Sequence, residues 1–166
     1  MTIWNSEKKW EEFSSGLRVL RGFGIRSSEK SITLHSPAAR TPVNMPQSVQ
    51  VEIDNWFETR FGIRFRQRSI FGTGSFEVAQ SYTRDFGEVR ALRPEADFCF
   101  CWSPLCEDLY GAYQECSPSE SIADMLDRLD FRCNDLYSAI LSGNEIMLVC
   151  SSIQAEKFVA HRNNEE

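Results

Sequence analysis

"IFGTGSFEVAQSY", residues 70–82, leads from a β-like run into a helix-like run through two glycines and two hydroxyl residues. After the turn, Val78 and Tyr82 lie four residues apart, as on one face of a helix. The turn Gly72–Ser75 has two interpretations. Either Ser75 caps the following helix, or the glycines and the free N–H groups of the helix start form a cradle for an anion. The turn has neither the third glycine of a dinucleotide fingerprint nor the lysine of a phosphate-binding loop.

Basic residues gather immediately before this turn. In "RFRQRSIF", residues 64–71, the side chains of a strand would alternate between two faces. Arg64, Arg66 and Arg68 are therefore predicted to share one side. The apolar positions upstream follow helical spacing, and Gly62 is placed to end that helix in a left-handed cap.

Helices and strands continue to alternate downstream of the turn. Ser117–Glu120 fits a capping box, and the apolar face that follows predicts a helix ending at Gly143. "EIMLVC", residues 145–150, is typical of a buried strand. Short strands at irregular spacing among helices indicate an α+β fold, in one compact domain over residues 1–166. The segments predicted to lack regular structure are a long loop, 27–47, and a solvated tail, 155–166.

The charge and composition of the whole chain narrow the function classes. The formal net charge is −6, from 24 acidic and 18 basic residues, so nucleic acid is not an expected partner. No apolar run is long enough to cross a bilayer, and "MTIWNSEKKWEEF" lacks the apolar core of a secretion signal. We therefore expect a cytoplasmic protein without a membrane partner. The six cysteines include no paired Cys-x-x-Cys knuckles and are expected to be reduced thiols, not metal ligands.

Three short motifs occur in an order that resembles the ADP-ribosyltransferase fold family, in which a strand arginine, a Ser-Thr-Ser-like segment and a late glutamate surround NAD. Taken alone, Arg21 and Glu145 are ordinary charges at strand ends. The resemblance rests on their order with the turn, and it spans about residues 17 to 150. It implies an α+β domain with a mixed or antiparallel split sheet and flanking helices, and NAD as a substrate. The matching pieces are "LRG" at 20–22, "FGTGS" at 71–75 and "GNEIML" at 143–148.

The resemblance also implies a role for each matching residue. Glu145 would be the catalytic carboxylate, which stabilises the oxocarbenium-like state formed when the nicotinamide–ribose bond breaks. A guanidinium fork suits the pyrophosphate, and an aromatic face suits the nicotinamide ring. The implied cofactor-binding residues are Arg21 or Arg68 at the pyrophosphate, Thr73 or Ser75 at the nicotinamide ribose, and Tyr82 on the nicotinamide.

The expected function follows from the resemblance. The protein would be an NAD-dependent mono-ADP-ribosyltransferase that modifies a protein target, or an NAD glycohydrolase when no acceptor is present. A toxin or phage-type effector fits this size, and a cognate inhibitor or antitoxin is then an expected partner. The alternative is a non-catalytic acidic protein, of the immunity or anti-defence type, that binds and blocks a protein partner. Its binding surface would include the aromatic and acidic loop that carries Glu107 and Asp108.

Overall fold

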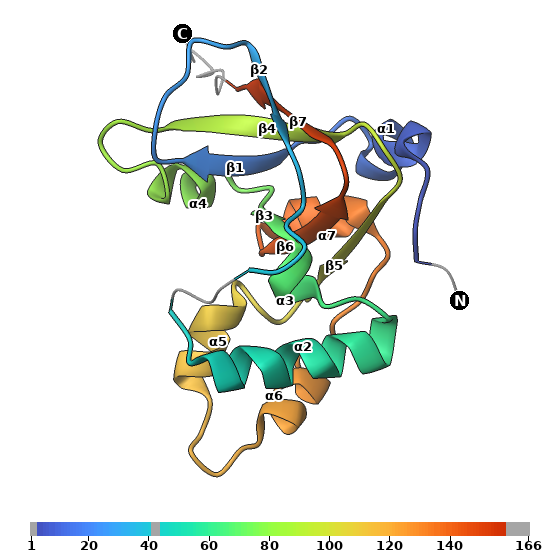
Figure 1. Cartoon of the computed structure of the whole chain (residues 1–166), viewed down its shortest axis with the longest axis vertical. Coiled ribbons are helices and arrows are strands. Elements are labelled where there is room, and N and C mark those ends of the chain that lie inside the picture. The colour runs from blue at the N-terminus through green and yellow to red at the C-terminus, as the bar shows by residue number, and fades with distance from the viewer. Residues whose placement is uncertain (1–2, 41–43, 159–166) are drawn as a thin grey trace, which may run out of the picture.

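The structure, a computed structural model that describes residues 3–40 and 44–158, consists of two antiparallel sheets with helices around them (Figure 1). The strands are β1 (Val19–Phe23), β2 (Ser31–Leu34), β3 (Ile70–Gly72), β4 (Glu88–Pro94), β5 (Phe98–Trp102), β6 (Ile146–Cys150) and β7 (Ile153–Lys157). One sheet has the strand order β1-β4-β7-β2 and the other has the order β3-β6-β5. The predicted α+β fold in one compact domain is confirmed.

An isolated main-chain bridge joins the two sheets where β1 passes β3. The N–H of Leu20 donates to the carbonyl of Thr73 at 2.7 Å, and the N–H of Thr73 donates to the carbonyl of Leu20 at 2.9 Å. Gly72 allows this approach, because a Cβ atom there would lie 2.5 Å from Cγ1 of Val19. The bridge therefore places β1 beside the turn that follows β3.

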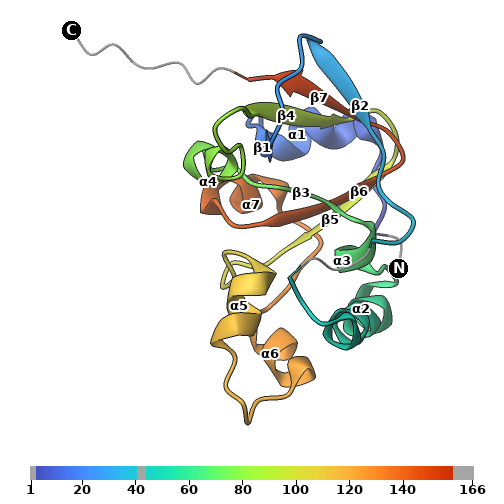
Figure 2. The ribbon, with the colours of Figure 1, turned by 60° about the vertical axis from the view of Figure 1, so that its left-hand side comes forward.

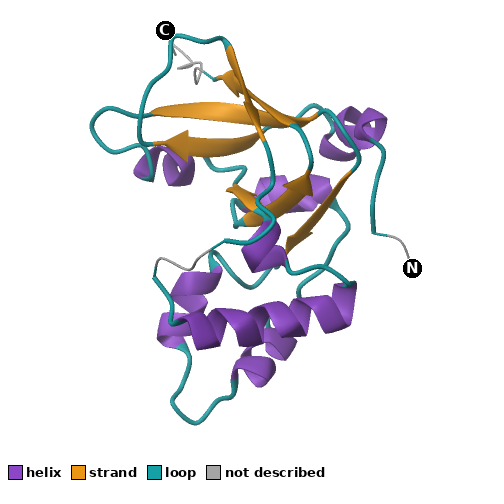
Figure 3. Cartoon of the chain, in the orientation of Figure 1, coloured by secondary structure: helices purple, strands orange, loops and turns teal. Residues whose placement is uncertain are grey.

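Helices pack on both sides of the three-stranded sheet and on one side of β1 (Figure 3). The helices are α1 (Trp10–Ser14), which follows a short 3-10 helix over Glu7–Lys9, α2 (Gln47–Phe61), α3 (Phe65–Arg68), α4 (Phe76–Ser81), α5 (Leu109–Glu115), α6 (Ile122–Arg128) and α7 (Leu136–Ser142). The helix α4 packs against β1, and α7 covers one face of the three-stranded sheet. The helices α2, α5 and α6 cover its other face.

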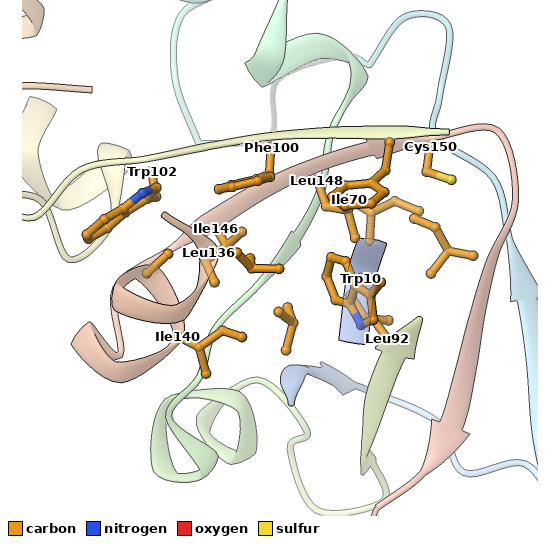
Figure 4. Packing of buried hydrophobic residues seen from close by; sticks show 14 of the residues in the cluster. Trp10, Ile70, Leu92, Phe100, Trp102, Leu136, Ile140, Ile146, Leu148 and Cys150 are labelled. Atoms are coloured by element: carbon orange, nitrogen blue, oxygen red, sulfur yellow. The ribbon is translucent and has the colours of Figure 1, made fainter. Parts of the chain in front are cut away.

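The strand β6 is buried on both faces and divides the core in two. Ile146 and Leu148 belong to the cluster that includes α7 and Trp10 (Figure 4). Met147 and Val149 pack on the opposite face, against α2, α5 and α6. Burial on both faces explains the continuous apolar run of this strand, whose prediction is confirmed.

The predicted helix from Ser117 to Gly143 is wrong, because this part of the chain forms two shorter helices, α6 and α7. Ser121, and not Ser117, caps α6 with its side chain. Between the two helices, Arg132 exchanges main-chain hydrogen bonds of 2.9 and 3.0 Å with Trp102 of β5. That pairing draws the chain out of helical geometry before α7 begins. The predicted end of the last helix at Gly143 is confirmed, at φ 70°.

Two segments that were predicted to lack regular structure contain strands. The strand β2 lies within the predicted loop 27–47, and β7 takes up the start of the predicted tail 155–166. The two strands pair with each other, and Ala155 of β7 is fully buried. The Ser- and Pro-rich flanks hide the short alternating pattern of β2. Residues 41–43 and 159–166 of these segments lie outside the described residues.

The predicted helix upstream of the turn is confirmed as α2. Gly62 ends it in the left-handed conformation, at φ 81°, which glycine adopts without steric cost. None of the helices in the described part of the chain combines the length and the apolar character that crossing a membrane requires.

The substitution Gly74→Ala is expected to destabilise the fold. A Cβ atom at this position would lie 1.9 Å from the carbonyl oxygen of Ile140, so α7 would have to move away from the turn. We expect a loss of about 2–3 kcal/mol in the free energy of unfolding, measured by urea denaturation. Gly24→Ala is the matched control, because a Cβ atom there meets no atom within 4 Å. Equal stability of the two variants would contradict the tight packing of the turn against α7.

Candidate functional site

A pocket of about 1000 Å³ opens where the two sheets meet. Its walls come from β1, the turn after β3, α4, the end of α7 and the segments around Arg40 and Asp108. Five of the predicted site residues line it, namely Arg21, Thr73, Ser75, Tyr82 and Glu145. The sixth, Arg68, is not part of the lining, so the structure favours Arg21 over Arg68 as the arginine of this pocket.

The GTGS turn forms one wall of the pocket and is fixed by its own hydroxyl groups. Ser75 Oγ accepts a hydrogen bond from the N–H of Val78 at 3.2 Å, so the predicted helix cap is confirmed. Thr73 Oγ1 donates to the carbonyl of Gly143 at 2.7 Å and accepts from the N–H of Ser75 at 3.1 Å. The same hydroxyl groups therefore cap α4 and tie the turn to the residues just before Glu145.

Arg21 lies next to the bridge between the sheets, and its neighbour Gly22 faces α4. A Cβ atom at Gly22 would lie 2.1 Å from the carbonyl oxygen of Ala79, so glycine is what lets α4 pack this close to β1. Arg21 Nη1 donates to the carbonyl of Phe71 at 2.8 Å. Burial lowers the pKa of Arg21, and the nearby charge of Arg40 lowers it further. A bound anion would offset both effects.

Two further arginines, Arg40 and Arg66, line the pocket although they were not predicted as site residues. Their guanidinium carbons lie 4.7 and 4.6 Å from the ring centroid of Phe71. Arg40 Nη2 donates to the carbonyl of Ser69 at 3.1 Å, and its own carbonyl accepts from Gln50 Nε2 at 3.0 Å. Burial lowers the pKa of Arg40, as does the charge of Arg66. The ring and the carbonyl of Phe71 thus gather three guanidinium groups at one part of the pocket.

The position of Arg66 in the pocket depends on α3, a helix that occupies part of a segment predicted to be a strand. Within the predicted strand 64–71, α3 replaces the first part, so the predicted row of three arginines on one face is wrong. Asp54, which is 2 % exposed, accepts from the N–H groups of Arg66 at 2.9 Å and Gln67 at 3.3 Å and fixes the first turn. Helical positions two apart point in directions about 200° apart. Arg66 therefore lines the pocket and Arg68 does not.

Glu145 lies directly before β6 and is paired inside the pocket. Its Oε1 accepts from Arg66 Nη1 at 3.0 Å, and its side chain is 21 % exposed. Its N–H donates to the carbonyl of Glu107 at 2.8 Å, which ties it to the acidic segment. Burial raises the pKa of Glu145, Arg66 counters this effect, and the charge of Asp108 adds to it. The carboxylate is therefore paired with Arg66 in a partly desolvated place.

Tyr82 and Asp108 extend the pocket towards solvent. Tyr82 follows α4 and is 60 % exposed. Burial of part of the side chain raises the pKa of Tyr82, and the charges of Asp108 and Glu145 raise it further. Asp108 Oδ1 accepts from the N–H of Gly111 at 2.7 Å and caps α5. An aromatic ring therefore lies beside two carboxylates.

The two missed arginines differ in how visible they were in the sequence. Arg40 lies in the long segment 27–47, and long loops are often functional, which was a usable signal. Arg66 had no signal of its own, because the strand pattern gave it the same face as Arg68.

The arrangement suits a ligand that carries both signs of charge. Three guanidinium groups can bind an anion with several oxygen atoms, such as a pyrophosphate, by forked hydrogen bonds. The carboxylates of Glu145 and Asp108 suit a cationic group of the ligand next to that anion. In residues 3–40 and 44–158, no three His, Cys, Asp or Glu side chains come together in a way that could hold a metal ion.

The substitution Arg40→Gln is expected to weaken the binding of inorganic pyrophosphate by about tenfold, since it removes one of three guanidinium groups. Isothermal titration calorimetry at low ionic strength measures the dissociation constant. Arg68→Gln is the matched control, because Arg68 lies outside the pocket lining, and its affinity should equal that of the wild type. Equal losses in the two variants would contradict the assignment of Arg40 to the anion site.

Known proteins supply no relative from which a role for this pocket can be taken. No protein-family model, no curated protein and no solved structure matches the chain.

Proposed function

We propose that the protein binds NAD in this pocket and transfers the ADP-ribose group to a protein acceptor, or to water when no acceptor is present. The observation that carries the proposal is the convergence of Arg21, the GTGS turn and Glu145, which are far apart in the sequence, on one pocket. The same three parts surround NAD in the ADP-ribosyltransferase family that these motifs resemble. An activity of this kind suits a toxin or phage-type effector, with a cognate inhibitor or antitoxin as a partner.

The charges and the size of the pocket support NAD as the ligand. NAD carries negative charge on its pyrophosphate and positive charge on its oxidised nicotinamide ring. The pyrophosphate would bind to the guanidinium groups of Arg21, Arg40 and Arg66. The positively charged nicotinamide ring would be attracted by the carboxylates of Glu145 and Asp108. The volume, about 1000 Å³, is at the upper end of the range for small-molecule sites and accommodates a dinucleotide.

Glu145 is the carboxylate that would act on the nicotinamide ribose. The C–N bond between nicotinamide and ribose breaks, its electron pair leaves with nicotinamide, and positive charge spreads over the ribose ring. A carboxylate already fixed in place stabilises that charge as it develops. A nucleophile of the acceptor, or water, then adds to the ribose and releases a proton. Arg66, 3.0 Å from Glu145, favours the ionised carboxylate that this role requires.

The non-catalytic alternative would use part of the same surface. Glu107 and Asp108, the acids of its expected binding loop, also line the pocket, and Asp108 already serves as the cap of α5. Release of nicotinamide separates the two functions, because NAD cleavage produces it and binding of a protein partner does not.

The wild-type protein is expected to release nicotinamide from NAD, and Glu145→Gln is expected to lower the rate by about 100-fold or more. The glutamine side chain has nearly the same size, so circular dichroism should show an unchanged fold. Glu156→Gln is the matched control, because Glu156 pairs with Arg93 on the four-stranded sheet, and it should keep the wild-type rate. If the wild type releases no nicotinamide with cell extract as a source of acceptors, NAD cleavage is not its function.

The rate of NAD cleavage is expected to fall on acidification at a pH above the ordinary carboxyl range. The ionised form of Glu145 is the active one, and burial raises its pKa above the value of about 4.3 for a free glutamate, so the carboxylate is lost at a higher pH. Asp108→Asn removes a neighbouring negative charge and should shift this acid limb to lower pH, while asparagine keeps the cap of α5. The profile of kcat/KM against pH measures both shifts. An acid limb that Asp108→Asn leaves in place would contradict the role of Glu145.

A further inference from the structure

Cys101 and Cys133 lie opposite each other at the point where β5 pairs with the segment between α6 and α7. Trp102 and Arg132 exchange two main-chain hydrogen bonds there, at 3.0 and 2.9 Å, in an antiparallel bridge. The next pair along the same register is Cys101 with Cys133. It is a non-hydrogen-bonded pair, the type whose Cα atoms lie about 4.5 Å apart, which falls within the range that a disulfide spans.

The two thiols also share a face and an environment. Cys101 is fully buried, Cys133 is partly buried, and both belong to the core cluster between the three-stranded sheet and α2, α5 and α6. Burial raises the pKa of the Cys101 thiol, and a side-chain hydrogen bond with Cys133 raises it further. The register and the shared cluster therefore make the two thiols neighbours, with Cys133 as the member that solvent reaches.

We propose that Cys101 and Cys133 are a redox-active pair that closes to a disulfide under oxidising conditions. With glutathione disulfide as the oxidant, the Cys133 thiolate attacks one sulfur, the S–S bond of glutathione disulfide breaks, and one glutathione thiolate leaves. The Cys101 thiolate then attacks the Cys133 sulfur of the mixed disulfide and displaces the second glutathione. The protein loses two electrons and two protons, which reduce one glutathione disulfide to two glutathione molecules.

The disulfide would close the base of the segment that carries α5 and α6, the yellow to orange part of the chain in Figures 1 and 2. This segment leaves the sheet after Trp102, contributes Glu107 and Asp108 to the pocket, and returns to β5 at Arg132, next to Cys133. Oxidation would therefore join its two ends covalently and restrict the acidic wall of the pocket. The pair does not depend on NAD cleavage, so either proposal can fail while the other holds.

The test is incubation of the full-length protein with glutathione disulfide, followed by intact mass measurement, thiol titration and peptide mapping under non-reducing conditions. The expected result is a loss of two hydrogens, four remaining thiols and one linked peptide pair that contains Cys101 and Cys133. The unfolding temperature should rise by about 5–10 °C, and dithiothreitol should reverse the rise.

Two variants complete the test. Cys101→Ser should stop the reaction at the mixed disulfide, so that one glutathione adduct stays on Cys133. Cys116→Ser is the matched control, because Cys116 is also partly exposed but lies outside the pair, and it should behave as the wild type. Six free thiols after oxidation of the wild type, or a disulfide that links other cysteines, would overturn the proposal. Because mapping of the wild type decides the outcome, a variant that fails to fold does not obscure it.

Discussion

The two main-chain hydrogen bonds between Leu20 and Thr73 determine how the pocket is built. They are where the edges of the four-stranded and three-stranded sheets meet, and they fix Arg21 on one strand relative to the turn on the other. Long side chains have many rotamers, so an ion pair alone defines a site poorly, whereas a main-chain bridge fixes the points from which the side chains start. Glycines at 22 and 72 remove the Cβ atoms that would keep β1, β3 and α4 apart.

The arginine cluster around Phe71 is positively charged, whereas the whole molecule is negatively charged. The net charge of −6 repels anions at long range, yet exposed charges more than about 10 Å apart are largely screened at ordinary ionic strength. Within that distance, the arginines gathered around Phe71 set the field. In the described part of the chain, Arg66 alone among them pairs with a carboxylate, that of Glu145. A compact anion can therefore bind to an acidic protein.

Local patterns predicted those elements whose causes lie within a few residues. The cap at Ser75 depends on its own hydroxyl and the next turn of helix, and the strand β6 on an apolar run buried on both faces. Elements whose causes are distant could not be predicted. The helix α3 depends on the buried carboxylate of Asp54, and the break before α7 depends on the main chain of Trp102. The candidate site follows the same rule. The order of motifs predicted that Arg21, the turn and Glu145 lie together in one pocket. It could not predict that Arg66 joins them, because the direction of its side chain depends on α3.

The glycines at the junction between the sheets also limit which residues of the pocket can be substituted in evolution. At Gly22, Gly72 and Gly74, any side chain would collide with main-chain or core atoms, so these three positions cannot be substituted one at a time. The segments that carry Arg40 and Asp108 present side chains to the same space without that restriction. Natural drift or deliberate redesign of ligand preference is therefore expected to proceed through these two segments, while the junction between the sheets stays the same.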